Sequence, residues 1–500
     1  MNTYMNTYIG IDIGTTSAKA LLMDEHGTVL RTASSEYPLS TPQNGWAEQS
    51  PSLWWDAAIA AVREVLAGID AANVRGVGLT GQMHGLVCLD EKDMVLRPAI
   101  LWCDQRTAAE CIEITEAIGE DRLIELTSNP ALTGFTAPKI LWMRNNEPEL
   151  YNRISKIMLP KDYIRYKLTG EHATDVSDAS GTGLLNVASR TWSNEVVAEL
   201  KINASALPQL YESSDITGAV TSYAAELTGI PAGIPVVAGA GDNAAAAVGT
   251  GVARDGETFV TIGTSGVIFT HTARMNLKSD KRIHTFCSAV TGEWHVMGVT
   301  LAAGQSLKWF RENFAAQYSY AELDEIANAA AIGSNGLLFL PYLNGERSPH
   351  LDPDCRGAFI GLSTIHNTAE LARAVMEGVV YSICDCRDVM TTMGVSLAQI
   401  TACGGGGSSA FWRQMLADAL DTSVVTAQTS EGPAFGAAIL AAVGTGAYAS
   451  VPEVCAAIIR HSDTQQPNAA ATSEYNKYHA IYKSLYPALQ SAFTELARGL

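Results

Sequence analysis

The sequence repeats one local pattern near the start of each half of the chain. Residues 8–14 form an apolar run that ends at Gly14-Thr15-Thr16-Ser17, a small turn rich in hydroxyl groups, and a second apolar run follows. The same order returns at residues 256–270, where the turn is Gly263-Thr264-Ser265-Gly266. Each half therefore contains a strand, a small turn and a returning strand. This repetition predicts an α/β chain of two related domains, whose turns face each other across a cleft.

Both turns are candidates for holding the phosphates of one triphosphate, because backbone N–H groups in a tight turn form a concave anion site. The first turn lacks the spacing and the ending of a Walker A loop. It also differs from the dinucleotide-binding fingerprint, because a strand and not a helix follows it. The alternative for each turn, taken alone, is an ordinary hairpin without a ligand.

A carboxylate stands where a buried strand gives way to a helix near the middle of the chain. The apolar residues 234–238 predict the strand, and the small residues 244–248 can open a closely packed helix. Gly241-Asp242-Asn243 lies between them. The free N–H groups and the dipole of a helix N-terminus favour an ionised Asp242, and its small neighbours leave room for a ligand. The alternative for Asp242 is a helix N-cap with no chemical role.

Three further segments are predicted to be loops. Met83 and His84 lie in a loop bracketed by glycines at the end of a short apolar strand, where a histidine is also compatible with a structural role. Residues 174–185 are expected to form a polar loop. Residues 404–408, four glycines and Ser408, are expected to be a flexible turn between a strand and a helix. Because consecutive glycines are entropically costly, this turn favours a ligand close to the backbone.

Composition restricts the partners of the chain. The formal net charge of -19 and the sequence pI near 4.9 argue against nucleic acid and against anionic membranes, which attract basic patches. No apolar run is long enough to span a bilayer, and the start lacks the features of a signal peptide. The nine cysteines show no Cys-x-x-Cys pair, which fits reduced thiols in a cytoplasmic enzyme. Met1-Asn2-Thr3-Tyr4 is repeated at once, and no function is assigned to that repeat.

Two long motifs carry a resemblance to a known family. The first is matched by Gly134, Thr136, Lys139, Trp142 and Asn146, and the second by Gly357, Phe359, Gly361, Glu370, Ala374 and Glu377. On these residues the chain resembles the FGGY carbohydrate kinases, members of the actin-like ATPase superfamily, over nearly its full length. Within that family, residues 82–85 and 241–243 resemble the branch that phosphorylates D-xylulose. Residues 46–49, 134–139 and 159–163 resemble the same branch.

The resemblance implies two ribonuclease-H-like α/β domains facing across a deep cleft, at residues 5–247 and 248–500. It implies ATP with Mg²⁺ as the phosphoryl donor and D-xylulose as the acceptor. Asp242 matches the family's general base, and Asp12 matches the carboxylate that holds Mg²⁺ and the phosphates. The sugar contacts correspond to Met83, His84, Asp242 and Asn243. The ATP contacts correspond to Thr15, Thr16, Lys19, Gly263, Thr264, Ser265, Gly405 and Gly406.

The resemblance leaves alternatives open. The acceptor could be another sugar, such as D-ribulose, L-xylulose or gluconate, because stereochemistry depends on a few loop side chains. A different class is an actin-like ATPase without a sugar acceptor, although such proteins lack the residue 82–85 loop and both signatures. Ser408 departs from the family, where a basic residue commonly follows the glycines, and this bears on nucleotide affinity. A homodimer is common among relatives and is one expectation here.

Overall fold

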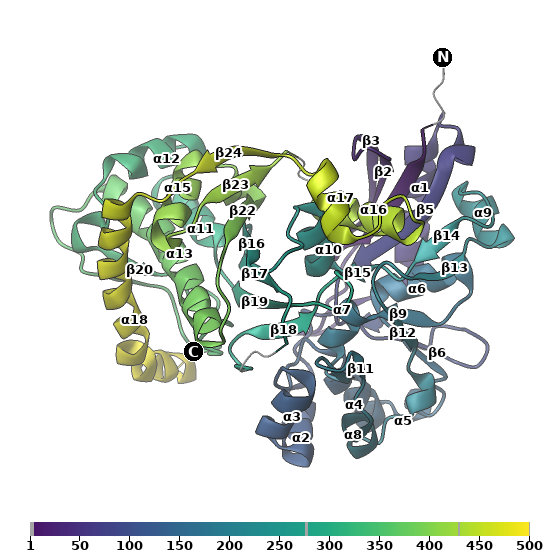
Figure 1. The fold of residues 1–500 in the computed structure, drawn as a ribbon. Helices are drawn as coiled ribbons and strands as arrows, with labels where there is room; N and C mark the ends of the chain where they lie inside the picture. The colour runs from purple at the N-terminus through teal and green to yellow at the C-terminus, as the bar shows by residue number, and fades with distance from the viewer. Residues whose placement is uncertain (1–4, 276–278, 429–430, 500) are drawn as a thin grey trace.

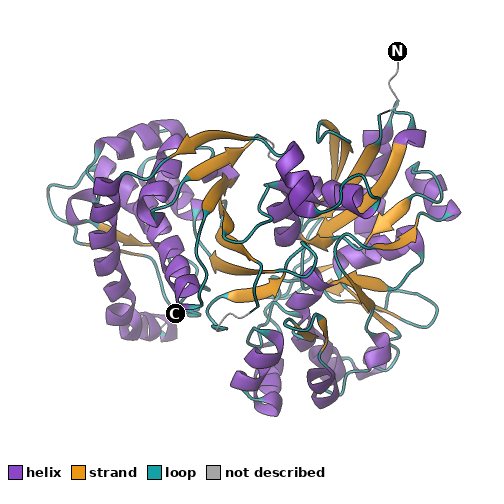
Figure 2. Ribbon diagram, viewed as in Figure 1, coloured by secondary structure: helices purple, strands orange, loops and turns teal. Residues whose placement is uncertain are grey.

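The computed structural model describes residues 5–275, 279–428 and 431–499, so the first copy of the repeated start lies outside the described residues. The described chain forms two lobes, each built on one seven-stranded sheet with helices against it (Figures 1 and 2). The first lobe contains mostly the purple to teal part of the chain, and the second lobe mostly the green to yellow part (Figure 1).

The sheet of the first lobe has the order β13-β14-β5-β1-β2-β3, with β15 beside β5. β1 pairs antiparallel with β2, where Asp12 lies opposite Lys19, and it pairs parallel with β5. β15 is also parallel to β5, and Gly241 lies opposite Gly81. The carboxyl ends of β1, β5 and β15 therefore meet at one edge, where ligands bind in open α/β sheets. The strands are β1 (Thr7–Ile13), β2 (Ser17–Asp24), β3 (Val29–Glu36), β5 (Val74–Gly81), β13 (Ile216–Ala219), β14 (Pro235–Val237) and β15 (Ala240–Gly241).

The sheet of the second lobe repeats the connections of the first. Its order is β18-β19-β17-β16-β22-β23-β24. Within it, β19-β17-β16-β22-β23 matches β3-β2-β1-β5-β14 in order and in strand direction. The strands are β16 (Glu257–Ile262), β17 (Gly266–Thr272), β18 (His284–Cys287), β19 (Trp294–Thr300), β22 (Gln399–Cys403), β23 (Val424–Ala427) and β24 (His461–Gln465). The duplication predicted from the two turns is thus confirmed in the topology.

Helices cover both sheets, and five small strand pairs lie outside them in the described residues. The helices are α1 (Pro51–Leu66), α2 (Ala108–Ile118), α3 (Glu120–Thr127), α4 (Thr136–Asn146), α5 (Pro148–Tyr151), α6 (Pro160–Thr169), α7 (Val176–Ala179), α8 (Asn194–Glu199), α9 (Ser222–Thr228), α10 (Asp242–Gly249), α11 (Gly304–Phe314), α12 (Tyr320–Ala329), α13 (Thr368–Thr392), α14 (Gly404–Gly407), α15 (Ala410–Leu420), α16 (Gly432–Gly444), α17 (Val451–Ile458) and α18 (Ala469–Arg498). The small pairs are β4 (Glu48–Gln49) with β7 (Ala99–Ile100), β6 (Val87–Leu89) with β8 (Lys156–Met158), β9 (Ala173–Asp175) with β12 (Gln209–Tyr211), β10 (Leu185–Asn186) with β11 (Thr191–Trp192), and β20 (Leu338–Leu340) with β21 (Ala358–Ile360).

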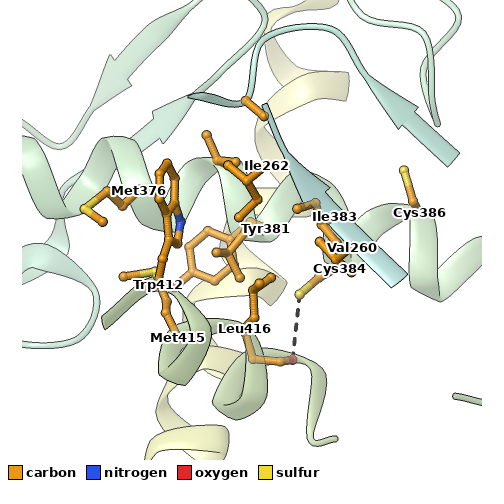
Figure 3. Packing of buried hydrophobic residues seen from close by; sticks show 14 of the residues in the cluster. Val260, Ile262, Met376, Tyr381, Ile383, Cys384, Cys386, Trp412, Met415 and Leu416 are labelled. Carbon is orange, nitrogen blue, oxygen red and sulfur yellow. Dashed lines mark hydrogen bonds between the residues drawn. The ribbon is translucent and has the colours of Figure 1, made fainter. Parts of the chain in front are cut away.

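The alternation of side chains along β16 explains why the second sheet is buried on both faces. Val260 and Ile262 point into an apolar core that they share with Tyr381 of α13 and Trp412 of α15 (Figure 3). Phe259 points the other way and packs in a separate cluster that contains Met83 and Phe135 of the first lobe. One face of this sheet thus holds its own helices, and the other face packs against the candidate sugar loop.

The helix α16 lies between β23 and β24 of the second sheet in the chain but packs on the first sheet, beside α10 (Figure 1). Glycines make this close approach achievable. A Cβ atom at Gly10 would lie 1.9 Å from the Ala434 carbonyl oxygen, and one at Gly78 would lie 1.9 Å from that of Ala437. A Cβ at Gly436 would lie 1.9 Å from the carbonyl oxygen of Ala245 in α10. The two lobes are therefore joined by a tightly packed helix pair.

Two predicted loops are wrong. Residues 174–185 include the end of β9, the helix α7 and a 3-10 turn, because the Asp175 carboxylate caps α7 by accepting from the Ser177 and Asp178 backbone N–H groups. The glycine run forms the helical turn α14 instead of a flexible turn. Close packing explains this conformation, since a Cβ at Gly406 would lie 2.5 Å from Cγ2 of Ile262.

Candidate active site

Asp242 is the first residue of α10, as the sequence predicts, but the predicted strand at residues 234–238 appears as β14, and a short unpredicted strand, β15, lies between it and Asp242. Gly241 takes the N-cap position, so the alternative role of Asp242 as an N-cap is wrong. One carboxylate oxygen, Oδ1, accepts from Asn243 N at 2.7 Å and from Asn243 Nδ2 at 2.9 Å. Burial raises the pKa of Asp242 to about 6, although both bonds from Asn243 lower it. Such a carboxylate is ionised at pH 7 and still basic enough to accept a proton.

Asp12 lies near the carboxyl end of β1, close enough to Asp242 for the two charges to interact. Burial and the charge of Asp242 together raise the pKa of Asp12 to about 7, and the charge of Lys19 opposes both effects. Two carboxylates that repel each other in a cleft create a site where a cation would be stabilised.

The first Gly-Thr-Ser turn is held in shape by side chains from around it. Tyr37 OH donates to Gly14 O at 2.6 Å, and Gln49 Nε2 donates to Thr15 O at 2.7 Å. Trp102 Nε1 donates to Thr15 Oγ1 at 3.0 Å, while Thr16 is exposed. Lys19, on the strand after this turn, forms an ion pair with Glu431 at the start of α16. These hydrogen bonds fix the conformation of the turn. The ammonium group of Lys19 is paired with a carboxylate from the second half of the chain.

The second turn is fixed by the start of α11. Gly304 N donates to Gly263 O at 2.7 Å, and Ala303 N donates to Thr264 O at 3.0 Å. Gly263 and Thr264 line a cavity of about 330 Å³, together with Gly405 and Gly406 and with side chains that include Tyr320 and Trp412. The structure thus brings Gly263 and Thr264 of the second turn and two residues of the glycine run to one pocket.

A larger cavity of about 730 Å³ lies between the lobes and is lined by Asp242, Asn243, Gly404, Gly407 and Ser408. Arg413 lines it as well, and its Nη1 donates to Gly407 O and Ser408 O, each at 2.9 Å. A guanidinium therefore stands beside the position where Ser408 departs from the family pattern. The remaining predicted residues line neither of these two cavities, and these are Asp12, Thr15, Thr16, Lys19, Met83, His84 and Ser265.

The candidate sugar loop packs directly against the Asp242 turn. A Cβ at Gly241 would lie 2.9 Å from Cγ of Met83, so the two segments are in contact. His84 adopts a left-handed φ of 67°, and its Nδ1 donates to Gly181 O at 2.7 Å. Lys139 Nζ and Thr136 Oγ1 donate to the His84 carbonyl oxygen at 2.9 and 3.1 Å. Both donors belong to the first family signature, which therefore supports the loop.

Aromatic rings from both lobes surround His84. Its imidazole stacks on Phe135 at a centroid distance of 4.8 Å, and Phe135 lies 6.1 Å from Phe286 of the second lobe. His284 stacks on Phe286 at 5.6 Å. Burial lowers the pKa of His84 and that of His284 to about 3, so both imidazoles are neutral. The sequence did not reveal Phe286 or His284, because their contacts with the loop are set by how the lobes pack.

A buried charged cluster, which we define as Lys161, Asp162, Asp175 and Asp178, lies behind the Asp242 turn. Lys161 Nζ lies 2.6, 2.8 and 3.3 Å from oxygens of the three carboxylates. Asp175 Oδ2 accepts from Ser177 Oγ, which in turn accepts from Gly241 N at 3.1 Å. The cluster is therefore linked to the residue before Asp242. The sequence feature that could have revealed this cluster is the three-residue spacing of Asp175 and Asp178, which places both carboxylates on one side of a helical turn.

The part of the chain that the structure describes shows neither a cluster of metal ligands nor a helix that could span a membrane. No group of three or more histidine, cysteine, aspartate or glutamate side chains is arranged to hold a metal ion there. Among the same residues, no helix combines the length and the apolar character needed to cross a membrane. All nine cysteines lie in described segments and are unpaired.

Comparison with known proteins assigns the family. Residues 7–249 match the N-terminal domain of the FGGY family of carbohydrate kinases, and residues 258–445 match its C-terminal domain. The chain is 39% identical to the xylulose kinase of Bacillus subtilis (strain 168), with 98% of this chain and 99% of that relative covered. It is similar to the crystal structure of xylulose kinase from Rhodospirillum rubrum, with 32% identity and a TM-score of 0.92 over 98% of this chain and 100% of the other. The gluconate kinase from Lactobacillus acidophilus is similar at 27% identity and a TM-score of 0.93, over 98% and 100% of the two chains. With both domains of the family model matched and the expected two-domain fold in place, the chain belongs to the FGGY family of carbohydrate kinases.

Proposed function

We propose that the protein transfers the γ-phosphoryl group of ATP to the terminal hydroxyl of D-xylulose, giving D-xylulose 5-phosphate and ADP. The observation that carries this proposal is the contact between the Met83–His84 loop and the Gly241–Asp242 turn, which places a carboxylate with a pKa near 6 beside the loop. The identity to named xylulose kinases over almost the whole chain supports D-xylulose as the acceptor.

Asp242 is assigned the role of general base. An alcohol is a poor nucleophile, so the Asp242 carboxylate accepts its proton while the sugar oxygen bonds to the γ-phosphorus. The bond between that phosphorus and the bridging oxygen breaks, and ADP leaves with the electron pair. Proton transfer to a positioned base contributes roughly 10²–10⁴-fold, and alignment with charge neutralisation supplies most of the rest.

Asp12 is the residue we assign to Mg²⁺. The fit rests on the mutual repulsion of Asp12 and Asp242, which a nearby cation would relieve. Mg²⁺ is usually bound through one or two carboxylates together with phosphates and water, so a cage of three protein ligands is not required. When bound, the ion neutralises charge on the phosphate oxygens. Asp12 would hold the ion on the side of the cleft that faces Asp242.

The ATP phosphates are assigned to the space between the two turns. Thr15, Thr16 and Lys19 would face them from the first lobe, and Gly263, Thr264 and Ser265 from the second. Lys19 would exchange its partner Glu431 for a phosphate oxygen. Gly405 and Gly406, in the 330 Å³ cavity beside Tyr320 and Trp412, would support the adenosine.

The test is ADP release with MgATP across a panel of ketoses, aldoses, polyols and gluconate, with a control lacking sugar. Selective stimulation by D-xylulose is expected. Asp242→Asn should lower kcat by roughly 10²–10⁴-fold and leave sugar binding measurable by calorimetry. The matched control is Asp121→Asn, which removes an exposed carboxylate from α3 and should leave the rate unchanged. Near-normal turnover of Asp242→Asn would remove Asp242 from the role of base.

The panel also decides between the alternatives. Stimulation by D-ribulose, L-xylulose or gluconate would keep the mechanism and change the acceptor, and the similar gluconate kinase fold makes gluconate a necessary member of the panel. ATP hydrolysis indifferent to every sugar would favour a non-kinase ATPase. We also propose that residues 5–247 and 248–500 are the two domains and that the protein is a homodimer. A cytoplasmic location is a further proposal, which the unpaired cysteines support because they fit a reducing compartment.

A further inference from the structure

The loop at residues 345–349 brings a guanidinium group to the side of the second lobe that faces the sugar loop. Ser348 N donates to Val299 O at 2.9 Å, so this loop runs along the edge of β19 beyond the point where β18 begins. His284, the first residue of β18, lies opposite Met297, two positions before Val299. At about 3.3 Å per residue, the backbone of Arg347 lies roughly 7–10 Å from that of His284.

The same loop is fixed next to the second phosphate turn. Thr300, the last residue of β19, lies opposite Gly266, which directly follows Ser265. The Glu346 carboxylate accepts from Thr300 Oγ1 at 2.5 Å and from Leu301 N at 2.9 Å, which anchors the loop at this strand end. Arg347 therefore lies between the ring cluster around His84 and the turn assigned to the phosphates.

Arg347 carries a charge that no carboxylate contacts directly in the described residues, and the nearby Glu346 carboxylate compensates it only at a distance. Within the described residues its guanidinium forms no ion pair and no hydrogen bond, and its side chain keeps part of its surface accessible. Burial lowers its pKa, the charge of Glu346 opposes that effect, and the charge of Arg347 contributes to lowering the pKa values of both His84 and His284. A buried guanidinium without a hydrogen-bonded counter-charge is destabilising, which is typical of a group that pairs with a ligand.

An anion is the ligand that best satisfies this site. The imidazoles beside Arg347 are neutral, and Lys139 already donates to the carbonyl oxygens of His84 and Gly134, at 2.9 and 2.6 Å. A neutral sugar hydroxyl would leave the guanidinium charge uncompensated. A phosphoryl group would compensate it, and the planar guanidinium can donate to two phosphate oxygens at once.

We propose that Arg347 is a catalytic residue whose guanidinium binds the phosphoryl group during its transfer and then holds it on the sugar phosphate product. This inference rests on the proposed function, because the group it binds is the one that moves from ATP to the acceptor. Arg347 neither gives nor takes a proton. It stabilises the charge on the non-bridging oxygens while the sugar oxygen–phosphorus bond forms and the bond to ADP breaks.

The first experiment compares calorimetric binding of D-xylulose and of D-xylulose 5-phosphate to the nucleotide-free wild type and to Arg347→Gln. The affinity for the sugar phosphate should fall about 10- to 100-fold, as for the loss of charge-assisted hydrogen bonds, while the affinity for the sugar changes less than about threefold. An equal loss for both ligands, or no loss for either, would overturn the proposal. If the wild type binds neither ligand and releases no ADP with D-xylulose, the proposed function fails and this inference fails with it.

The second experiment measures turnover and chemical rescue. Arg347→Gln should lower kcat by about 10²–10³-fold with little change in the KM of the sugar, and added guanidinium ion should restore part of the kcat of Arg347→Ala. The matched control is Arg356→Ala, which removes a guanidinium that donates to Pro353 O and Cys355 O in the segment that follows this loop. It should retain the wild-type kcat. A similar loss in both variants without rescue would show a structural role only and would refute the inference.

Discussion

Replacing Lys161 by methionine should be one of the most destabilising single changes in the first lobe. The ammonium group has no exposed surface and faces three carboxylates that are equally buried. Methionine has nearly the same length and fills the same space. The change therefore removes the charge and leaves Asp162, Asp175 and Asp178 facing one another without a cation.

The expected magnitude follows from the loss of one partner of a buried ion pair, which costs about 3–5 kcal/mol. For a cooperative unit of the size of one lobe, this corresponds to a fall in Tm of roughly 6–20 °C. The assay is the thermal unfolding transition of Lys161→Met beside the wild type at pH 7. The matched control is Lys156→Met, because Lys156 pairs with Asp93 where both side chains are partly exposed. Loss of such a surface pair should cost only about 0–1 kcal/mol.

The loss of thermal stability in Lys161→Met should also depend on pH. Burial already raises the pKa of Asp178 well above its ordinary value, and Lys161 is the group that opposes this rise. An acid whose pKa is higher in the folded state than in the unfolded state gains stability from protonation, so this stability is lost as pH rises through the folded-state pKa. The variant should therefore recover part of its Tm between pH 7 and pH 5, and Asp178→Asn should rescue it at pH 7. A Tm within about 2 °C of the wild type at pH 7 would refute the reasoning.

Two further predictions concern the catalytic base and the helix pair. Because Asp242 must be ionised to accept a proton and its pKa is raised to about 6, the kcat/KM for the sugar should fall about tenfold per pH unit below pH 6, and a rate that stays flat to pH 5 would contradict this assignment. Gly436→Ala should destabilise the protein by about 1–3 kcal/mol in thermal unfolding, because its Cβ would meet Ala245 O at 1.9 Å. The control is Gly432→Ala in the same helix, where a Cβ would make an ordinary contact at 3.7 Å, and equal effects of the two changes would argue against tight packing as the cause.

The sequence predicted those features of the fold that local patterns determine. The two turns and the strands around them appear in the structure as predicted, because alternating apolar residues and small turn residues specify hairpins over short distances. The strand β14 and the start of α10 at Asp242 followed in the same way from an apolar run and a run of small residues, whereas the short strand β15 between them did not.

The sequence could not predict contacts between distant segments. His284 and Phe286 join His84 and Phe135 only because the face of the second sheet that bears Phe259 packs on the first lobe. The glycine run was expected to be flexible, since glycine has a low helix propensity, but tertiary packing against Ile262 overrides that propensity.

The position of α16 has a consequence for how the chain could be divided. The first sheet receives part of its cover from a helix that is synthesised some 410 residues later than β2, and α10 of the first half packs in turn on Phe259 and Phe269 of the second sheet. Neither half is a self-sufficient module. A fragment that stops after α10 would expose the backbone groove around Gly10 and Gly78, and exchanging one half with that of a relative would require the two helices to be exchanged as a matched set.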